Sequence, residues 1–322
     1  MGECMDLPDE KILIDLAEQF KIAQGLPANE HIKLLKNLEK VQPERLCIVL
    51  NYFLTLEKNK EVLCYLVKTI AKCQNSLTVE ILSDMLISSL KDNSDESIRL
   101  KCEIANTMGQ SQNQSCVMPL LYVLNNKDEN YKLRLACADA LGRIGSSYAV
   151  VPLIDLVGDD EEKSMYLRES AAKALGMLGD IRAIEPLANI LENKNGLFDR
   201  FTFLKERIVE TLGRLGQYGD EKSIHALKHA LEDEAACVRV GAIEALSEID
   251  DERVVPLIEK MLDDKDEEVA KSAVFALYDM FGKDYLSSLL NSEHLQQCCR
   301  EEITELLEEP EEISVEVDRD EE

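Results

Sequence analysis

The 322-residue chain has no tryptophan, no strand-like alternation of apolar and polar residues, and no long hydrophobic run. Apolar runs such as Leu46–Leu50 are far too short to cross a bilayer, which takes about 20 apolar residues. The chain also begins without a signal-peptide pattern. These absences exclude a helical membrane protein, and we expect no membrane partner and a cytoplasmic location.

Basic residues are scarce: 36 lysines and arginines face 63 acidic residues, for a formal net charge of −27. Residues 301–322 contribute −11 of this charge, so −16 belongs to the remaining 300 residues. Proteins that bind nucleic acid usually carry a basic stripe that releases phosphate counterions, and none is visible here. We therefore expect no nucleic-acid partner.

The ten cysteines do not predict a disulfide framework, because a helical protein of this length can bury a sufficient core without cross-links. Several stand within helical patterns, where a free cysteine packs as a small apolar residue; these are Cys64, Cys102, Cys116, Cys137 and Cys237.

The chain does contain a sequence motif that repeats about every 34 residues. It reads LRLACADALGRIGSSYAVVPLIDLV from Leu133 and LRESAAKALGMLGDIRAIEPLANIL from Leu167. The glycine of the Ala-Leu-Gly phrase and its equivalents recur with gaps of 33, 34, 37, 34 and 31, at Gly109, Gly142, Gly176, Gly213, Ser247 and Tyr278. A fixed period of this length is typical of a solenoid, in which each repeat buries its apolar face against its neighbours.

Each repeat is predicted to hold two helices. In the second, apolar residues such as Leu167, Ala171, Ala174 and Leu178 form one stripe at a period of 3.6. Between the two helices stand pairs that fit a capping box at a helix start: Asn93 with Glu96, Asn126 with Glu129, Asp159 with Glu162, and Asp264 with Glu267. The glycine pairs at Gly142 and Gly145, Gly176 and Gly179, and Gly213 and Gly216 are interpreted as helix terminators rather than phosphate loops.

The proline ten residues after the glycine (Pro119, Pro152 and Pro186), followed by leucine and a small-residue helix, closely resembles the HEAT-like repeats of phycobilin lyases and of many scaffold proteins. The resemblance covers residues 93–290 and implies an all-α, right-handed α-α superhelix, a HEAT/armadillo-like solenoid of about eight helix pairs. Ala226, Ser247, Tyr278 and Ala270 depart from the pattern. Because such repeats serve many tasks, the resemblance says little about function.

Four segments are expected. Residues 1–92 hold diverged helical repeats, 93–291 the HEAT-like repeats, 292–309 a capping helix and 310–322 a disordered acidic tail. No linker rich in proline, glycine or serine occurs near residue 92, so we expect one continuous stack there.

A basic residue stands eight positions before the register mark in five of the six repeats: Lys101, Arg134, Arg168, Lys205 and Arg239. We interpret this basic ladder as structural, with each side chain bridging to an aspartate or a loop carbonyl of a neighbouring repeat. Asp180 and Asp220 are the candidate partners.

Solenoids bind partners on the concave surface that their curvature creates. Helical spacing places ten outward residues of the second helices there: Asp139, Arg143, Glu169, Lys173, Met177, Glu206, Glu210, Arg214, Glu244 and Glu248. Six are acidic and three basic, which fits either a docking surface or an ordinary solvated face.

The lengthened repeat between Gly176 and Gly213 contains Phe198, Phe201 and Phe203, three of the seven phenylalanines. They either form an interface hot spot or fold back to fill the wider repeat.

Enzymatic chemistry has little support. His225 and His229 are spaced i, i+4, but Ala226 follows the first where a metalloprotease needs glutamate, so a solvated pair is favoured over a metal site. The HEAT-like hydroxylase that modifies deoxyhypusine relies on repeated His-Glu pairs, and no His-Glu dipeptide occurs here.

The sequence therefore predicts a non-enzymatic scaffold or adaptor that binds one or more proteins and has no cofactor. The alternative is a phycobilin lyase-like protein that attaches, removes or chaperones a tetrapyrrole.

Truncation after Glu309 should leave the thermal midpoint of unfolding unchanged, because the removed residues are highly charged and nearly without apolar side chains. Differential scanning calorimetry of the two chains tests this. A drop of several degrees would show that the tail packs on the folded repeats.

Overall fold

The computed structural model describes residues 18, 20–22, 26–36, 43–71, 73, 75–192, 201–217, 219–291 and 295–308. All regular structure within these residues is helical. The chain divides into two compact units, Met1–Ala183 and Ile184–Glu322. The fold is the all-α solenoid that the repeat pattern predicts.

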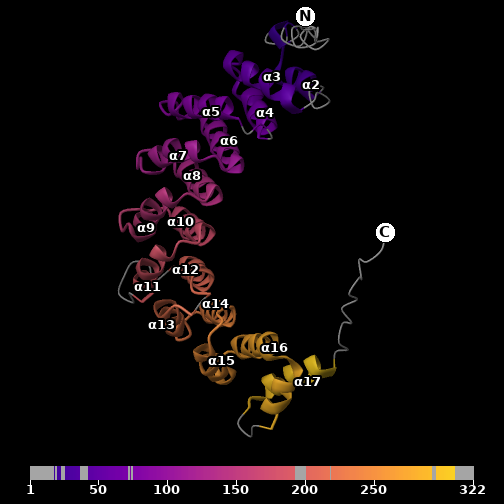
Figure 1. The fold of residues 1–322 in the computed structure, drawn as a ribbon, viewed down its shortest axis with the longest axis vertical. Coiled ribbons are helices and arrows are strands. Elements are labelled where there is room, and N and C mark those ends of the chain that lie inside the picture. Colours follow the sequence, from indigo (N-terminus) through magenta and orange to yellow (C-terminus); the bar gives the residue numbers. More distant parts are fainter. Residues whose placement is uncertain are drawn as a thin grey trace, which may run out of the picture. The chain divides into compact units, whose positions relative to one another are not determined.

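Unit 1 holds nine of the labelled α-helices (Figure 1): α2 (Ala28–Lys36), α3 (Pro43–Leu56), α4 (Lys60–Ile70), α5 (Ser76–Ser88), α6 (Asp95–Ser111), α7 (Val117–Leu124), α8 (Tyr131–Ile144), α9 (Val150–Gly158) and α10 (Met165–Leu178). Short 3-10 helices precede three of the first helices: η2 (Gln114–Cys116), η3 (Ser147–Ala149) and η4 (Ile181–Ala183).

Unit 2 holds α11 (Ile184–Glu192), α12 (Thr202–Leu215), α13 (Glu221–Ala230), α14 (Ala236–Ser247), α15 (Val255–Lys260), α16 (Glu267–Leu289) and α17 (Gln297–Glu308), with η6 (Glu252–Val254) and η7 (Met261–Asp263). Gly282 interrupts α16 with φ 74° and ψ −168°, so α16 is two helices joined at a kink. The last helix, α17, packs against α16.

Within each unit the helices form two rows. In unit 1 the second helices α6, α8 and α10 pack side by side, while α5 and α7 belong to the other row (Figure 1). In unit 2, α12, α14 and α16 form one row, and α11 and α13 lie beside each other in the other. Most of the predicted apolar stripe faces the core, since Leu167, Ala171 and Ala174 of α10 are fully buried, whereas Leu178 is half-buried.

The register glycines allow the second helices to approach closely. A Cβ atom on Gly142 of α8 would lie 2.9 Å from the Cα of Ala174 on α10, and one on Gly109 would lie 2.8 Å from the Cα of Ala140. Gly142 and Gly213, the first glycines of two predicted terminator pairs, are thus packing residues inside helices. The second does end a helix at Gly145 and Gly179, whose positive φ angles of 74° and 66° favour glycine. Gly216, with φ −89°, does not share this conformation.

The predicted capping boxes are wrong as helix starts. The helices begin later, and the caps of α6, α8 and α10 are Ser94, Asn130 and Ser164. The side chains of Asn126 and Asp159 instead accept hydrogen bonds from the backbone N–H groups of Asp128 and Glu161, two residues later in the chain. These bonds close the turn between the two helices of a repeat. This leaves the glutamate of the motif free for another partner.

For Glu129 and Glu162, that partner is a cation of the basic ladder. Four of its cations reach a carboxylate in the turn of the following repeat, and the pairs are Lys101–Glu129 at 3.4 Å, Arg134–Glu162 at 2.5 Å, Lys205–Asp233 at 2.7 Å and Arg239–Asp264 at 2.8 Å. Burial is deep: Lys101 is 0% and Arg134 4% exposed. A buried charge is tolerated only when it is paired and hydrogen-bonded, so these contacts fix how one repeat meets the next.

The carbonyls that the ladder also uses belong to its own repeat. Arg134 Nε donates to Leu124 O at 2.8 Å, and Arg239 Nη1 donates to Asp233 O at 2.8 Å. Arg168 Nη2 donates to two such carbonyls, those of Asp159 and Glu162. The ladder therefore ties the turn of one repeat to the turn of the next.

The candidate partners Asp180 and Asp220 were wrong. Asp180 instead accepts from Arg182 at 2.6 Å, and Asp220 caps α13 by accepting from Ser223 N. Both are short-range contacts at a helix start, which the repeat spacing alone does not distinguish from contacts between repeats.

The cysteines include one departure from the expectation of unbridged thiols. A disulfide joins Cys47 of α3 to Cys73, just beyond α4. Seven other cysteines within the described ranges are free, and Cys116 and Cys137 are fully buried as predicted for small apolar residues. Cys237, however, is exposed.

The four-segment division stays a prediction. Residue 92 lies inside unit 1, and the compact units instead divide between Ala183 and Ile184. The predicted acidic tail, residues 310–322, lies outside the described residues.

Replacing Arg134 by methionine should lower the free energy of unfolding by about 3–5 kcal/mol, because the Glu162 carboxylate would stay buried without its cation. The double variant R134M/E162L should recover most of this loss, since an apolar pair can replace a buried ion pair. Urea denaturation followed by circular dichroism measures both.

The control is Arg182→Met, which breaks a pair whose arginine is 54% exposed and should cost less than about 1 kcal/mol. An equal loss in the two single variants would contradict the assigned role of the buried ladder.

Candidate protein-binding groove

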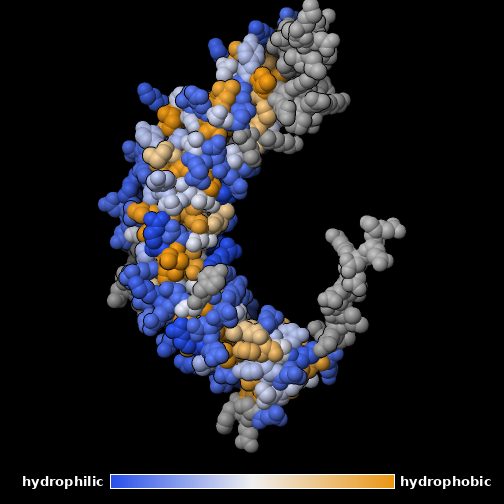
Figure 2. All heavy atoms as spheres, viewed as in Figure 1, coloured by the Kyte–Doolittle hydropathy of each residue, from blue (hydrophilic) through white to orange (hydrophobic). Residues whose placement is uncertain are grey.

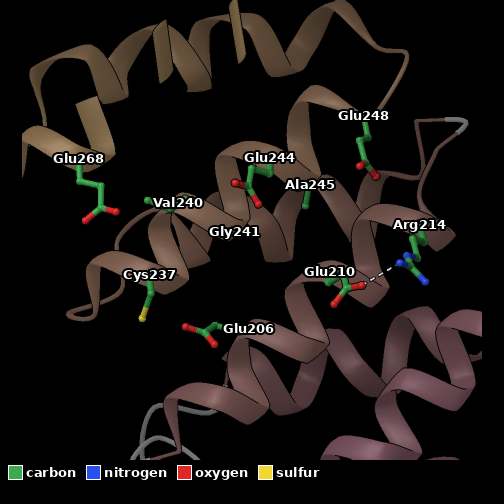
Figure 3. A pocket seen from close by; sticks show the side chains of 10 residues that line it. All are labelled: Glu206, Glu210, Arg214, Cys237, Val240, Gly241, Glu244, Ala245, Glu248 and Glu268. Atoms are coloured by element: carbon green, nitrogen blue, oxygen red, sulfur yellow. Dashed lines mark ion pairs between the residues drawn. The ribbon is translucent and has the colours of Figure 1, made fainter. Parts of the chain in front are cut away.

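A groove of about 490 Å³ lies on the second helices of unit 2. Its residues come from α12, α14, the residue just after α14 and the start of α16 (Figure 3), and they are Glu206, Glu210, Arg214, Cys237, Val240, Gly241, Glu244, Ala245, Glu248 and Glu268. The spacing 237, 240, 241 and 244 places one continuous face of α14 in the groove.

The groove is strongly acidic, with five glutamates and one arginine in its lining. Glu210 is neutralised by neighbours on its own helix: Arg214 Nη2 lies 2.8 Å from Glu210 Oε1, and Arg207 bonds the other oxygen. The other four form no ion pair with any described residue. Their charge is available to a cationic ligand.

Cys237 is the single thiol of the lining. A hydrogen bond to Glu206 raises its pKa, and partial burial and the nearby carboxylate charge act in the same direction. A cysteine nucleophile needs a depressed pKa, because the thiolate is the reactive form. Cys237 is therefore a poor nucleophile and serves here as part of the surface.

Two exposed phenylalanines lie on the same helices as residues of the groove. Phe203 is 77% exposed and lies on the same face of α12 as Glu206 and Glu210, at i, i+3 and i+7. Phe275 of α16 is 44% exposed and holds the register position of Glu210 and Glu244, three residues before the mark. Figure 2 shows hydrophobic residues on the surface at the place of α16.

The structure brings together five of the ten predicted concave residues in this groove, namely Glu206, Glu210, Arg214, Glu244 and Glu248. The five of unit 1 lie outside this groove: Asp139 accepts from Ser170 at 2.8 Å, Arg143 donates to Asn106 at 3.0 Å, and Lys173 and Met177 are exposed. Glu169 is half-buried.

Sequence reasoning missed Cys237, Val240 and Glu268. Cys237 was assigned to the core because it stands in a helical pattern, although the i, i+3, i+7 spacing to Val240 and Glu244 places it on the outward face.

In the lengthened repeat, Phe203 is exposed, Phe201 is half-buried and Phe198 lies outside the described residues. The exposure of Phe203 is what a docking residue requires. Its role stays a prediction.

Metal and membrane sites find no support among the residues that the structure describes. His225 Nδ1 lies 3.1 Å from a Glu192 oxygen, but no group of three or more possible ligands is suited to a metal ion in the described ranges. None of the helices searched there is long and apolar enough to span a membrane.

The family model for HEAT repeats matches residues 83–165, 126–202 and 197–278. These ranges cover more than half of the chain, and the chain belongs to the HEAT-repeat family. No curated protein sequence matches it.

The chain is also similar to several solved structures. The chain is 23% identical to a chain of the CpcE–CpcF complex of phycocyanin lyase from Nostoc sp. PCC7120, over 72% of its own length and 94% of that chain, with a TM-score of 0.44. Human deoxyhypusine hydroxylase is 18% identical to this chain, over 82% of this chain and 96% of the hydroxylase, with a TM-score of 0.36.

Yeast Kap95p (importin-beta), from a study of its binding to RanGDP, is 15% identical over 92% of this chain but only 46% of its own, with a TM-score of 0.54. At these identities the likeness shows a helical solenoid and does not identify a partner.

Changing Phe198, Phe201 and Phe203 together to serine tests the two interpretations of the aromatic segment. If the segment docks a partner, the melting curve should stay unchanged while binding weakens by about 2 kcal/mol or more. If the side chains fill the wider repeat, stability should fall by several kcal/mol.

The single variant Phe203→Ser is the control, because Phe203 is exposed and its loss leaves no cavity. A steep loss of stability in the triple variant, measured by circular dichroism, would end the docking interpretation.

Proposed function

We propose that this chain is a non-enzymatic scaffold that binds a basic segment of a partner protein in the groove of α12, α14 and α16. The observation that carries the proposal is the concentration of five glutamates in one groove, of which only Glu210 is paired in the described part of the chain. Four like charges on one surface repel one another, so a cationic ligand that neutralises them gains electrostatic energy.

The exposed phenylalanines indicate which side chains the partner segment carries. Phe203 stands beside the acidic face of α12, and Phe275 holds the equivalent position on α16. Exposed aromatics contribute to binding when they contact an apolar side chain or stack on a guanidinium. The partner segment is therefore rich in arginine and carries apolar residues next to its cations.

A tetrapyrrole suits this groove less well. Its propionate groups would meet the unpaired Glu206, Glu244 and Glu248, and like charges in a groove disfavour binding. The raised pKa of Cys237 also disfavours covalent attachment there.

The proposal can be tested with a fluorescein-labelled peptide in which arginines alternate with leucines, using fluorescence anisotropy and the full chain. Reversing two groove charges, in E206K/E244K, should weaken binding about tenfold or more, and added salt should weaken binding to the unaltered chain. A peptide with lysine in place of arginine should bind less tightly, because only arginine combines two-point carboxylate contacts with aromatic stacking.

The matched control is E234K/E252K, which makes the same charge change at exposed glutamates of unit 2 outside the groove. Equal losses in the two double variants, or no saturable binding by the unaltered chain, would overturn the proposal.

A further inference from the structure

Unit 1 contains a second groove, of about 690 Å³, along α4. Its lining comes from α2, α4, α6 and the residues just before α4. It contains four cations and two carboxylates, in a chain with 36 basic and 63 acidic residues. Its charge is thus opposite to that of the groove in unit 2.

Two of the cations are held in place by contacts at the edge of the groove. Lys60 Nζ lies 2.5 Å from Asp92 Oδ2 and 2.9 Å from Ser94 Oγ, which joins the start of α4 to the turn before α6. Lys68 Nζ lies 3.4 Å from Glu103 Oε2 on α6. These pairs define the walls and contribute little net charge.

The other two cations are unpaired. Lys58 and Arg99 are exposed, and neither side chain makes an ion pair or hydrogen bond to any residue that the structure describes. They come from different elements, the residues before α4 and the N-terminal part of α6, so a ligand lying between those elements would meet both.

Part of the lining is apolar. Cys64 and Tyr65 of α4 and Ile32 of α2 line the same groove as the cations, and Cys64 is buried. Apolar surface beside unpaired cations suits a ligand that has both carboxylates and a hydrophobic side chain.

Two carboxylates in the lining restrict the class of ligand that the groove can bind. Glu61 and Glu96 are exposed and have no cation partner among the described residues. A nucleic-acid strand, with a charge on every phosphate, would meet them with repulsion. A peptide can place neutral residues opposite Glu61 and Glu96 and keep its acidic residues for Lys58 and Arg99.

We propose that the groove of α2, α4 and α6 binds an acidic peptide segment of a partner protein, with an apolar side chain against Tyr65 and Ile32 and carboxylates on Lys58 and Arg99. This site is separate from the acidic groove of unit 2 and does not depend on it. A scaffold with both sites holds two segments of opposite charge.

The probe is a fluorescein-labelled peptide in which glutamates flank a pair of leucines, measured by anisotropy against the full chain. The double variant K58E/R99E should weaken its binding about tenfold or more, and a probe with serines in place of the leucines should bind less tightly. Because both side chains are exposed and unpaired, the melting curve should not change. Binding of the arginine–leucine peptide should also stay unchanged, so the two grooves are tested separately.

The control is K163E/K228E, which changes the net charge equally at exposed lysines outside this groove. Equal loss in this control would overturn the proposal. So would displacement of the probe by single-stranded RNA of matched charge. Tighter binding of the probe after removal of residues 309–322 would assign the groove to the acidic terminus of the chain itself and would also overturn it.

Discussion

The buried contact between a ladder cation and a carboxylate of the next repeat is the constraint on which the rest of the structure depends. Arg134 and Glu162 are 28 residues apart, and neither charge is tolerable in the interior without the other. Apolar stripes alone would allow neighbouring helices to slide, because hydrophobic contact has no direction. A buried ion pair with hydrogen-bonded geometry has one satisfactory arrangement, and it therefore fixes the register between repeats.

This internal use of basic residues helps to explain the charge of the surface. Three paired ladder cations, Lys101, Arg134 and Arg239, are buried, and Lys205 is half-buried against Asp233, so these charges do little to offset the glutamates of the exposed faces. The register glycines also shape this surface. Gly213 of α12 packs against Ala245 of α14 and brings the two helices close enough to line one groove. The packing that holds the repeats together thus also produces a narrow acidic groove between neighbouring second helices.

Much of the fold and part of the groove could be predicted from the sequence. The 34-residue period predicted the helix pairs, and helical spacing predicted five residues of the groove. The ladder partners could not be predicted, because an Asx-x-x-Glu motif fits both a capping box and a turn whose glutamate, such as Glu129, pairs with a distant cation. The Cys47–Cys73 disulfide joins α3 to the residues after α4, in a region where no repeat spacing indicated which side chains meet.

Net charge and local charge have different consequences for binding. At physiological ionic strength a charge is screened beyond about 8 Å, so a ligand in a groove responds to the side chains around it more than to the total of −27. The overall acidity argues against a nucleic-acid-binding protein, whose basic surface must extend along many phosphates. It does not argue against a short acidic peptide, which needs only Lys58 and Arg99 together with nearby apolar surface. For this reason a strongly acidic repeat protein can present binding sites of both signs.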